Sequence, residues 1–357
     1  MTAPDSIAGS IAIVGGGIIG ATTAWRLAQR GFKITLHEKG KLGSEASWAG
    51  AGMLSPGEMD EPFENAELFF RSRSLYRSFV PELVKATGVA IDYRECGAID
   101  LAYSADEAAR LREKAARQQA FGIRSREITP DQVRVFSPYV QTEGLVSALF
   151  YPGDGIVDPR NVMTALRVAC AQTGVDLREN SPVASIVVDS SAVRINGESF
   201  AAAILAAGAW SGGIPVSGVP ALPASEPVKG HLMGFDLQLG ACPTIIRHGH
   251  NYLLQRGSGF LIAGASAEHL GFHREISKEI ADQLYNEASQ ILPVLEKLHS
   301  VDVWTGLRPG AEKLQLGQWH NSRLFLAYGH YRNGILLAPG TAEYLTEEID
   351  RANFAAA

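Results

Sequence analysis

Hydrophobic and polar residues follow a strand, helix, strand order over the first part of the chain. Residues Ile11 to Val14 form a short apolar run, Ile18 to Arg30 carries apolar side chains at helical spacing, and Lys33 to Glu38 is again strand-like. Because a helix connects the two strands, they are expected to lie parallel in one sheet. The pattern therefore predicts a βαβ unit.

Later segments have the end signals of helices. Residues Ser104 to Gly122 begin with the serine and glutamate spacing of a capping box and end on glycine. Residues Asp158 to Gly174 begin with Asp-Pro, a favoured helix start, and also end on glycine. Helices are also predicted for Ser277 to Leu292 and for a final segment that ends near Ile349.

Between these helices the pattern favours strands. Residues Val193 to Ile195, the Asn196-Gly197 turn and the strand leading to Ala207 are expected to form a hairpin. Short apolar runs punctuated by glycines indicate β structure from Lys229 to Ala265, and Leu324 to Ala327 is predicted as the last strand.

Gly15, Gly17 and Gly20 form a G-x-G-x-x-G pattern between the first strand and the first helix. There they permit a tight turn, close approach of the backbone to a pyrophosphate and packing of the helix on the strand. Glu38 ends the second strand, where a carboxylate can accept hydrogen bonds from both ribose hydroxyls of an adenosine. We predict a dinucleotide site, against the alternative of a glycine-rich turn without ligand. Glu38 disfavours NADP, whereas FAD and NAD stay open.

Composition narrows the possible partners. Single cores stop growing at about 250 to 300 residues, so a chain of 357 residues is expected to contain two domains. A net charge of −6 leaves no basic face for nucleic acid. No apolar run reaches the roughly 18 residues of a membrane span, and no signal peptide precedes the first strand, which favours the cytoplasm.

The cysteine residues give no sign of a disulfide framework or a metal site. Cys96, Cys170 and Cys242 are far apart and odd in number. We predict three buried thiols and no metal.

Four further segments resemble FAD-dependent proteins of the D-amino acid oxidase type. The small-residue run from Ser44 to Pro56 is similar to the loop that follows their dinucleotide unit. The segment Leu205 to Ser211 is similar to their strand and turn near the FAD phosphates. The segment Trp304 to Gly310 is similar to their substrate-carboxylate motif. Gly329 to Pro339 closely resembles the C-terminal flavin segment of glycine oxidases of the thiamine-biosynthetic type. The likeness runs in order from Ile11 to Ile349.

The resemblance implies FAD as the cofactor. A flat flavin ring can lie against backbone only where side chains are absent, which suits the run from Ala49 to Gly52. Related sarcosine oxidases hold their flavin through a cysteine after the arginine motif, but no cysteine follows Cys242 here, so we expect noncovalent binding. The residues expected to contact FAD are Gly15, Gly17, Ile18, Ile19, Gly20, Glu38, Lys39, Ala46, Ser47, Ala51, Gly52, Met53, Val183, Ala207, Gly208, Trp210, Arg308, His330, Tyr331, Arg332, Asn333, Gly334, Ile335 and Leu336.

The expected fold is α/β plus α+β, with a Rossmann-like FAD-binding domain interleaved with a smaller β-rich substrate domain. The FAD-binding domain is predicted to comprise residues 1–92, 150–221 and 309–357. The substrate-binding domain is predicted to comprise residues 93–149 and 222–308.

The resemblance also implies residues for the substrate. Arg308 is the expected partner of a substrate carboxylate, because a planar guanidinium binds that group through two parallel hydrogen bonds. Tyr252 corresponds to a tyrosine that helps to hold the carboxylate, although it could be a core aromatic of a strand. His250 is expected close to the entrance, Met53 in the substrate cavity and Arg332 beside the pocket.

Three functions stay open at this point. The first is an oxidase that converts glycine, sarcosine or a small D-amino acid into an oxo acid and ammonia, with oxygen reduced to hydrogen peroxide. The second is a flavin dehydrogenase subunit that passes electrons to a partner or a quinone. The third is an FAD-binding module without turnover. Whichever of these functions holds, the resemblance implies that the protein is a homo-oligomer.

Three departures from the family pattern are expected near the pocket. Residues Ala311 to Gly317 replace an aspartate, glycine and proline pattern, Gln255 to Gly257 replaces a Pro-Arg sequence, and Trp48 replaces a smaller residue. The substrate is therefore left open between glycine and another small amine.

Overall fold

The computed structural model describes residues 9–56 and 66–352. Its first sheet has six strands, of which five run parallel and the edge strand β20 is antiparallel. In spatial order they are β20 (Gln315–Gln318), β21 (Leu324–Tyr328), β13 (Ala202–Leu205), β1 (Ser10–Val14), β2 (Lys33–His37) and β9 (Asp176–Arg178).

The six-stranded sheet is the middle of three layers. Along β1, Ile11 and Ile13 pack into the core that the sheet shares with the helices, whereas Ala12 and Val14 pack into a core on the opposite face. The helices are α1 (Ile18–Gln29), α3 (Ala66–Thr87), α6 (Pro159–Gln172) and α8 (Gly334–Ala352). The opposite face is covered by a four-stranded sheet of β12 (Glu198–Phe200), β11 (Val193–Ile195), β10 (Ile186–Val188) and β14 (Val216–Ser217).

A mixed eight-stranded sheet forms the other half of the molecule. Its order is β19 (Asp302–Gly310), β15 (Glu226–Asp236), β18 (Phe260–Gly264), β17 (Asn251–Gln255), β16 (Ile245–His248), β5 (Ala98–Ala102), β7 (Ser147–Tyr151) and β6 (Arg126–Ile128). It packs against α7 (Lys278–Ile291), α4 (Ala105–Gln119) and α5 (Pro130–Phe136). Met233 and Phe235 of β15 share a buried core with Ile291 of α7.

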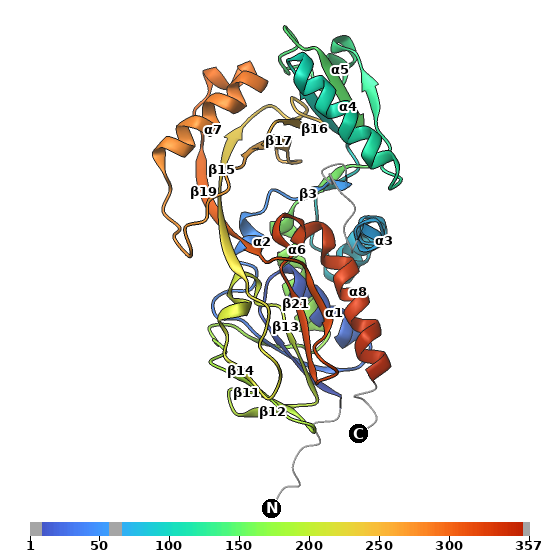
Figure 1. Ribbon diagram of the computed structural model, residues 1–357, viewed down its shortest axis with the longest axis vertical. Coiled ribbons are helices and arrows are strands. Elements are labelled where there is room, and N and C mark those ends of the chain that lie inside the picture. The colour runs from blue at the N-terminus through green and yellow to red at the C-terminus, as the bar shows by residue number, and fades with distance from the viewer. Residues whose placement is uncertain (1–8, 57–65, 353–357) are drawn as a thin grey trace, which may run out of the picture.

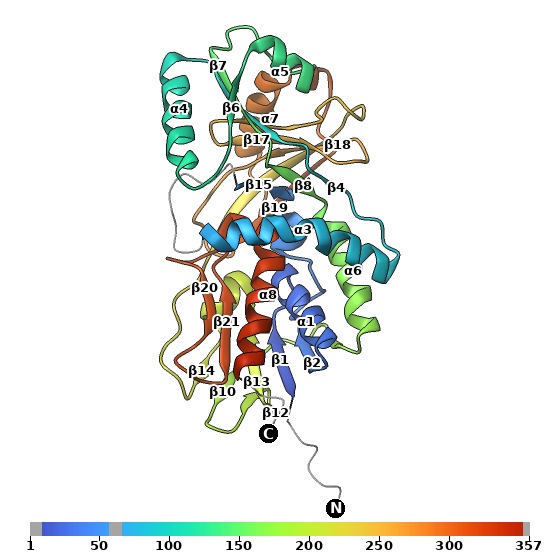
Figure 2. The ribbon, with the colours of Figure 1, turned by 90° about the vertical axis from the view of Figure 1, so that its right-hand side faces the viewer.

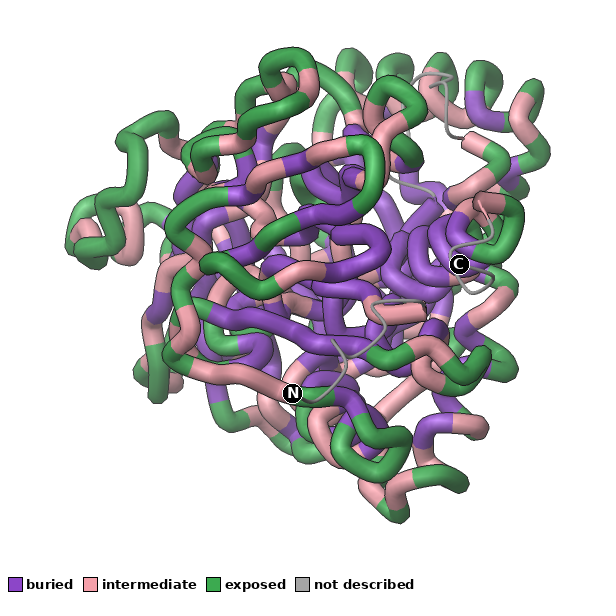
Figure 3. Tube along the Cα trace, turned by 90° about the horizontal axis from the view of Figure 1, so that it is seen from below, coloured by how far each residue is buried: buried purple, intermediate pink, exposed green. Residues whose placement is uncertain are grey.

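The two halves meet along the long strands β15 and β19. Figure 1 shows β15 rising from the lower half, which holds β13 and β21, to the upper half beside α7. Figure 2 shows α3 lying across the middle of the molecule next to α8. Seen from below, the buried residues form a continuous centre that is surrounded by exposed segments (Figure 3).

Short elements complete the chain between the two large sheets. A three-stranded sheet joins β3 (Met53–Leu54), β8 (Gly155–Val157) and β4 (Tyr93–Arg94). The remaining helices in the described part of the chain are α2 (Ala46–Ala49), η2 (Gly208–Gly213), η3 (Pro293–Lys297) and η4 (Tyr331–Asn333).

Most predicted elements are confirmed, but two expectations are wrong and one long helix was missed. The hairpin strand ends at Phe200, and Ala202–Leu205 is a separate strand, because β12 pairs with β11 whereas β13 pairs with β1 and β21. The 22-residue helix α3 was not expected. Cys96 is only half-buried, although Cys170 and Cys242 are buried.

The sheets draw on the segments expected for two interleaved domains. The expected boundaries at residues 150 and 309 fall inside β7 and β19. The division itself stays a proposal. No helix in residues 9–56 and 66–352 is long and apolar enough to cross a membrane.

Candidate active site

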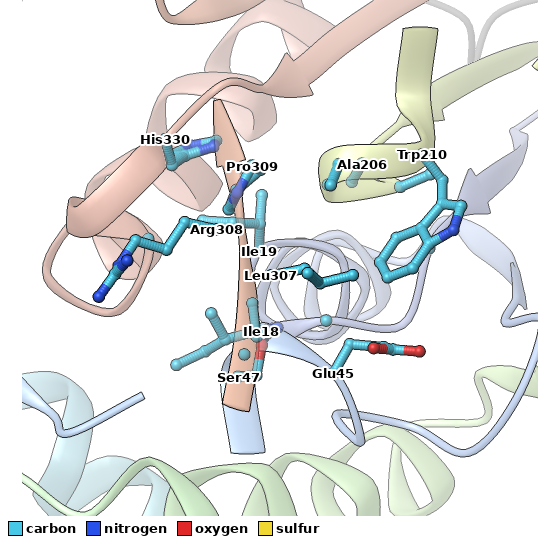
Figure 4. A pocket seen from close by; sticks show the side chains of 18 of the residues that line it. Ile18, Ile19, Glu45, Ser47, Ala206, Trp210, Leu307, Arg308, Pro309 and His330 are labelled. Carbon is cyan, nitrogen blue, oxygen red and sulfur yellow. Dashed lines mark hydrogen bonds between the residues drawn. The ribbon is translucent and has the colours of Figure 1, made fainter. Parts of the chain in front are cut away.

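A cavity of about 560 Å³ lies between the six-stranded and the eight-stranded sheet. Its walls come from the turn after β1, the ends of β2 and β13, the segment from α2 to β3, strands β15, β17 and β19, and η4 with the start of α8. Figure 4 shows Trp210 and Glu45 on one side and the Arg308 side chain extending away from them on the other. The cavity therefore draws on distant parts of the chain.

The glycine-rich turn forms one wall of the cavity. Gly15 has φ +108°, and a Cβ added there would come within 2.6 Å of the Ala206 carbonyl carbon. A Cβ on Gly20 would collide with the Gly15 carbonyl oxygen, so Gly20 allows the helix to pack on the turn. Gly17 is the N-cap of α1 and has no side chain to cap the helix. The N-terminus of α1 therefore faces the cavity with backbone donors, which favours an anion.

Ser47 reaches this helix terminus from α2. Its Oγ accepts a hydrogen bond from Ile18 N at 2.9 Å and is buried. The contact ties the small-residue segment to the start of α1.

Glu38 fixes the loop that follows β2. The carboxylate is 7% exposed and accepts hydrogen bonds from Gly16 N and Gly40 N, both at 2.8 Å. An ionised carboxylate has about four lone-pair positions, so Glu38 can still accept hydroxyl donors from the cavity.

The segment from Ala49 to Gly52 presents backbone to the cavity. A Cβ on Gly306 would lie 2.6 Å from Ala49 Cβ, and one on Gly52, which has φ +97°, would collide with the Val157 carbonyl oxygen. Trp304 Nε1 donates a hydrogen bond to Ala49 O at 3.0 Å. The segment is held against β19 and β8 at positions where only glycine fits.

The start of α8 forms the opposite wall and is completed by α3. Pro339 has no N–H, so the Ile335 carbonyl lacks its helical donor, and the Tyr76 hydroxyl of α3 donates to that carbonyl instead. The Ser72 hydroxyl donates to Leu336 O at 2.7 Å and accepts from Gly340 N at 2.9 Å. In an uninterrupted helix these two backbone groups would pair. Two hydroxyls of α3 therefore complete the wall that carries η4.

Arg308 brings positive charge into the cavity. Its Nη1 donates to Ser266 O at 2.9 Å, and the side chain is half-buried. Burial lowers the pKa of the guanidinium, and the nearby charge of Arg332 acts in the same direction, yet an arginine stays charged at neutral pH. Tyr252 lines the same cavity and pairs with Gly264, where a Cβ would lie 3.0 Å from the tyrosine hydroxyl. Glycine thus makes room for the tyrosine ring.

His330 lines the cavity but carries no charge at neutral pH. Burial lowers its pKa to about 3, and Nε2 lies 3.1 Å from Thr341 Oγ1. His330 is therefore a neutral hydrogen-bonding side chain at the base of α8.

The comparisons with known proteins agree with this geometry. Residues 10–348 match the family model of FAD dependent oxidoreductases. The glycine oxidase of Geobacillus kaustophilus is 33% identical over 350 residues, which cover 96% of this chain and 93% of that protein. The chain belongs to the FAD-dependent oxidoreductase family.

Two solved structures have the same fold as this chain. The crystal structure of glycine oxidase from Geobacillus kaustophilus superposes with a TM-score of 0.89 at 32% sequence identity, covering 96% of this chain and 94% of that one. L-proline dehydrogenase from P. horikoshii superposes with a TM-score of 0.85 at 23% identity, covering 96% and 93% of the two chains. The latter likeness concerns the fold alone.

The cavity suits the cofactor that the family name states. The pyrophosphate of a dinucleotide binds at a helix N-terminus whose backbone is not covered by side chains, and the turn from Gly15 to Gly17 supplies such a terminus. The ribose binds an acid at the end of the second strand, and Glu38 occupies that position. A flat ring needs bare backbone, which Ala49 to Gly52 supplies. The residues present therefore fit FAD.

Nearly all residues expected from the sequence line the cavity. These are Gly15, Gly17, Ile18, Ile19, Glu38, Lys39, Ala46, Ser47, Ala51, Gly52, Met53, Val183, Ala207, Gly208, Trp210, Tyr252, Arg308, His330, Tyr331, Arg332, Asn333, Gly334 and Ile335. Their roles toward FAD and substrate stay proposals.

Three of the expected residues do not reach the cavity. His250 is exposed in the turn between β16 and β17, because the strand that carries Tyr252 begins only at Asn251. Leu336 faces the hydrophobic core, and Gly20 packs behind Gly15.

The three departures from the family pattern do not line the cavity, but two of them lie next to it: Trp48 precedes the lining residue Ala49, and Arg256 Nη2 donates to Gly50 O at 3.4 Å. Trp48 is 39% exposed and stacks with the Arg160 guanidinium, whose Cζ lies 3.8 Å from the ring centroid. Gln255 points away from the cavity and binds the β15–β16 connection through Gly240 N and Gln238 O. Residues 311–317 form the approach to the edge strand β20 and its first part.

Sequence reasoning missed several lining residues, above all Gly230 and Leu232 of β15 and Phe272 before α7. A glycine within a strand signals that another group approaches the backbone closely, so Gly230 could have been found as a candidate position. The group that approaches Gly230 could not have been identified from the sequence.

Proposed function

We propose that this protein oxidises the carbon–nitrogen bond of a small amino acid, with glycine, sarcosine and small D-amino acids as the substrate class. The observation that carries the proposal is that Arg308 and Tyr252 line the same cavity as the bare backbone of Ala49 to Gly52. None of the cavity-lining residues that the structure describes belongs to the departures from the family pattern. The printed names of several relatives support the same class.

Arg308 would bind the substrate carboxylate. Ser266 O occupies one of its five N–H groups, so the others stay available for two parallel hydrogen bonds. The Tyr252 hydroxyl would donate a further hydrogen bond to the carboxylate. Together they would orient the α carbon of the substrate. Orientation of the reacting atom increases the reaction rate more than binding of the substrate alone does.

Apolar side chains would limit the size of the substrate. Met53 and Leu232 line the same cavity as Arg308, and the Met53 side chain is only half-buried. A small amine with one carboxylate fits between these groups and Arg308. A long side chain would have to displace them.

FAD, when bound, supplies the two-electron acceptor that an amine oxidation requires. Residues around Gly17 would hold its pyrophosphate, Glu38 its adenosine ribose, and Gly334 and Ile335 the flavin end. The binding is proposed to be noncovalent, since no cysteine is among the lining residues in the described part of the chain. The substrate would lose a hydride from the α carbon and a proton from the nitrogen, and water would convert the resulting imine into an oxo acid and ammonia, or methylamine where the substrate is sarcosine.

Oxygen is the proposed electron acceptor, with hydrogen peroxide as product, and a homo-oligomer is the proposed assembly. Light scattering of the purified protein would measure the assembly. Peroxide formation would identify the acceptor, whereas reduction by the amine without oxygen uptake would favour a partner or a quinone.

The decisive experiment is anaerobic mixing of the purified yellow protein with glycine, sarcosine and small D-amino acids. Bleaching of the flavin absorbance near about 450 nm reports the oxidation directly. We expect rapid bleaching with at least one of these amines and at least 100-fold slower bleaching in Arg308→Gln, because an amide cannot supply the charged, two-pronged contact. No bleaching with any of them would refute the proposal.

A further inference from the structure

A cluster of buried and half-buried polar side chains lies on the face of the eight-stranded sheet that points away from the cavity. It comprises Lys229 and His231 of β15 together with Ser266 and Glu268, which follow β18. Lys229 is 3% exposed and His231 0%. Because side chains alternate along a strand, Gly230 between them faces the cavity instead. We name this group the β15 polar cluster.

Hydrogen bonds fix every member of the β15 polar cluster. The Ser266 hydroxyl donates to Glu268 Oε1 at 2.8 Å and accepts from His231 N at 2.9 Å. His231 Nδ1 lies 2.8 Å from the same carboxylate oxygen, and Lys229 Nζ lies 3.4 Å from the other. Glu268 is therefore paired on both of its oxygens.

The protonation state of His231 follows from its second partner. Ser277 N donates to His231 Nε2 at 2.9 Å. A backbone N–H can only donate, so Nε2 accepts, and the ring proton sits on Nδ1 and points to Glu268. Burial lowers the pKa of His231, in keeping with a neutral ring. The cluster is thus one lysine, one carboxylate and a neutral histidine of fixed tautomer.

A β-bulge connects this cluster to the cavity. Leu232 pairs with Gly264 and Lys229 bridges to Glu268, so two residues on β15 lie opposite three on the other segment. Bulges redirect the groups of the bulged strand. Ser266, within the bulge, sends its hydroxyl into the cluster while its carbonyl accepts from Arg308 Nη1 at 2.9 Å. One residue therefore couples the two faces of the sheet.

We infer that the β15 polar cluster positions Arg308, with His231, Ser266 and Glu268 as positioning residues for the substrate carboxylate. The inference rests on the proposed function, in which Arg308 binds that carboxylate. Arginine is long and flexible, and a displacement of about 1 Å in a positioning group can cost about 100-fold. The hydrogen bonds of the Ser266 hydroxyl hold the residue whose carbonyl restrains the guanidinium. Glu268 and His231 fix that hydroxyl.

The test is the binding of acetate to the FAD-loaded protein, followed through the change in flavin absorbance. Acetate carries the carboxylate without an oxidisable amine. We expect Glu268→Ala and Ser266→Ala to raise the acetate Kd by about 10 to 100-fold. FAD content should stay unchanged. Met233→Leu is the matched control, because Met233 is buried on the same face of β15 but belongs to the hydrophobic core, and its Kd should stay within about twofold of wild type.

A rescue separates positioning from general damage. His231→Phe removes the donor to Glu268, whereas His231→Asn keeps an N–H close to the place of Nδ1. The asparagine variant should therefore bind acetate more tightly than the phenylalanine variant. In turnover with the active amine, Ser266→Ala should raise KM and lower kcat together, because a displaced Arg308 both binds the carboxylate less well and orients the α carbon less well. If Glu268→Ala does not fold, Glu268→Gln takes its place, because glutamine keeps the shape of the side chain and one oxygen acceptor. Its acetate Kd should lie above that of wild type, by less than the rise expected for Glu268→Ala.

Two results would overturn the inference in distinguishable ways. If wild type binds acetate and the variants of Ser266 and Glu268 bind it equally well, the cluster does not position Arg308, and the proposed function stands. If wild type itself shows no acetate binding, the role of Arg308 toward a carboxylate fails, and with it both proposals.

Discussion

The guanidinium of Arg308 occupies the space that a side chain on Gly230 would need. A Cβ built on Gly230 would lie 2.6 Å from Arg308 Cζ. The two residues are diagonal neighbours on β15 and β19, where Val228 pairs with Arg308 and Gly230 pairs with Gly306. Strand pairing and one missing side chain therefore place the charge in the cavity.

Gly230→Ala should displace the arginine without removing it. Because the methyl group and the guanidinium cannot share the space, we expect the acetate Kd and the substrate KM to rise by about 10 to 100-fold. Gly153→Ala is the control, since a Cβ there meets nothing within 4 Å. Equal acetate affinity in Gly230→Ala and wild type would show that Arg308 can bind from another position.

Glu38→Gln should weaken FAD binding. An amide has one acceptor oxygen, so it cannot accept from both Gly16 N and Gly40 N, and one buried donor loses its partner at a cost of about 1–3 kcal/mol. The FAD Kd, measured by quenching of flavin fluorescence, should rise about 10-fold or more. Glu198→Gln, at an exposed ion pair with Arg178, should leave it unchanged.

His330 should make stability depend on pH. Its folded-state pKa of about 3 lies below the ordinary 6.5, so the unfolded chain binds the proton more readily and stability is lost as pH falls below 6.5. Between pH 7 and pH 5 this amounts to about 2 kcal/mol. Urea unfolding of the FAD-loaded protein at pH 7 and at pH 5 measures this loss in the free energy of unfolding. The loss should be larger by that amount in wild type than in His330→Gln. Parallel losses in the two proteins would contradict a neutral buried histidine.

Tyr76→Phe should destabilise the start of α8. The Ile335 carbonyl would lose its donor while Pro339 still offers none, which costs about 1–3 kcal/mol. Thermal unfolding should show the loss, and the FAD Kd should rise because Ile335 lines the cavity. Tyr139→Phe, at an exposed ring, is the control and should change neither quantity.

The sequence was most informative where structure is local. The turn from Gly15 to Gly20 and Glu38 lie within one βαβ unit, and their spacing alone predicts their geometry. Arg308 and Tyr252 were found through segments that resemble a family. Their arrangement relative to each other depends on β15, β18 and β19, which no local pattern specifies.

The errors have physical reasons as well. Phe69, Tyr76, Phe79 and Leu83 have helical spacing, but Pro81 interrupts the signal, although α3 continues through it. Gln255 is close to Tyr252 in sequence, yet the period of two along β17 turns its side chain to the opposite face. Contacts such as Ser266 with Arg308 join strands far apart in the chain and become visible only in three dimensions.

The completion of α8 by hydroxyls of α3 bears on how the protein is made. A growing chain that has passed Arg308 already contains the glycine turn and the whole of α3, but Ser72 and Tyr76 still lack the helix whose backbone they complete. β21, which supports one side of the sheet, is also missing at that stage. The cavity wall that α8 forms can therefore be completed only after α8 has left the ribosome, which makes completion of the cavity a late step in folding.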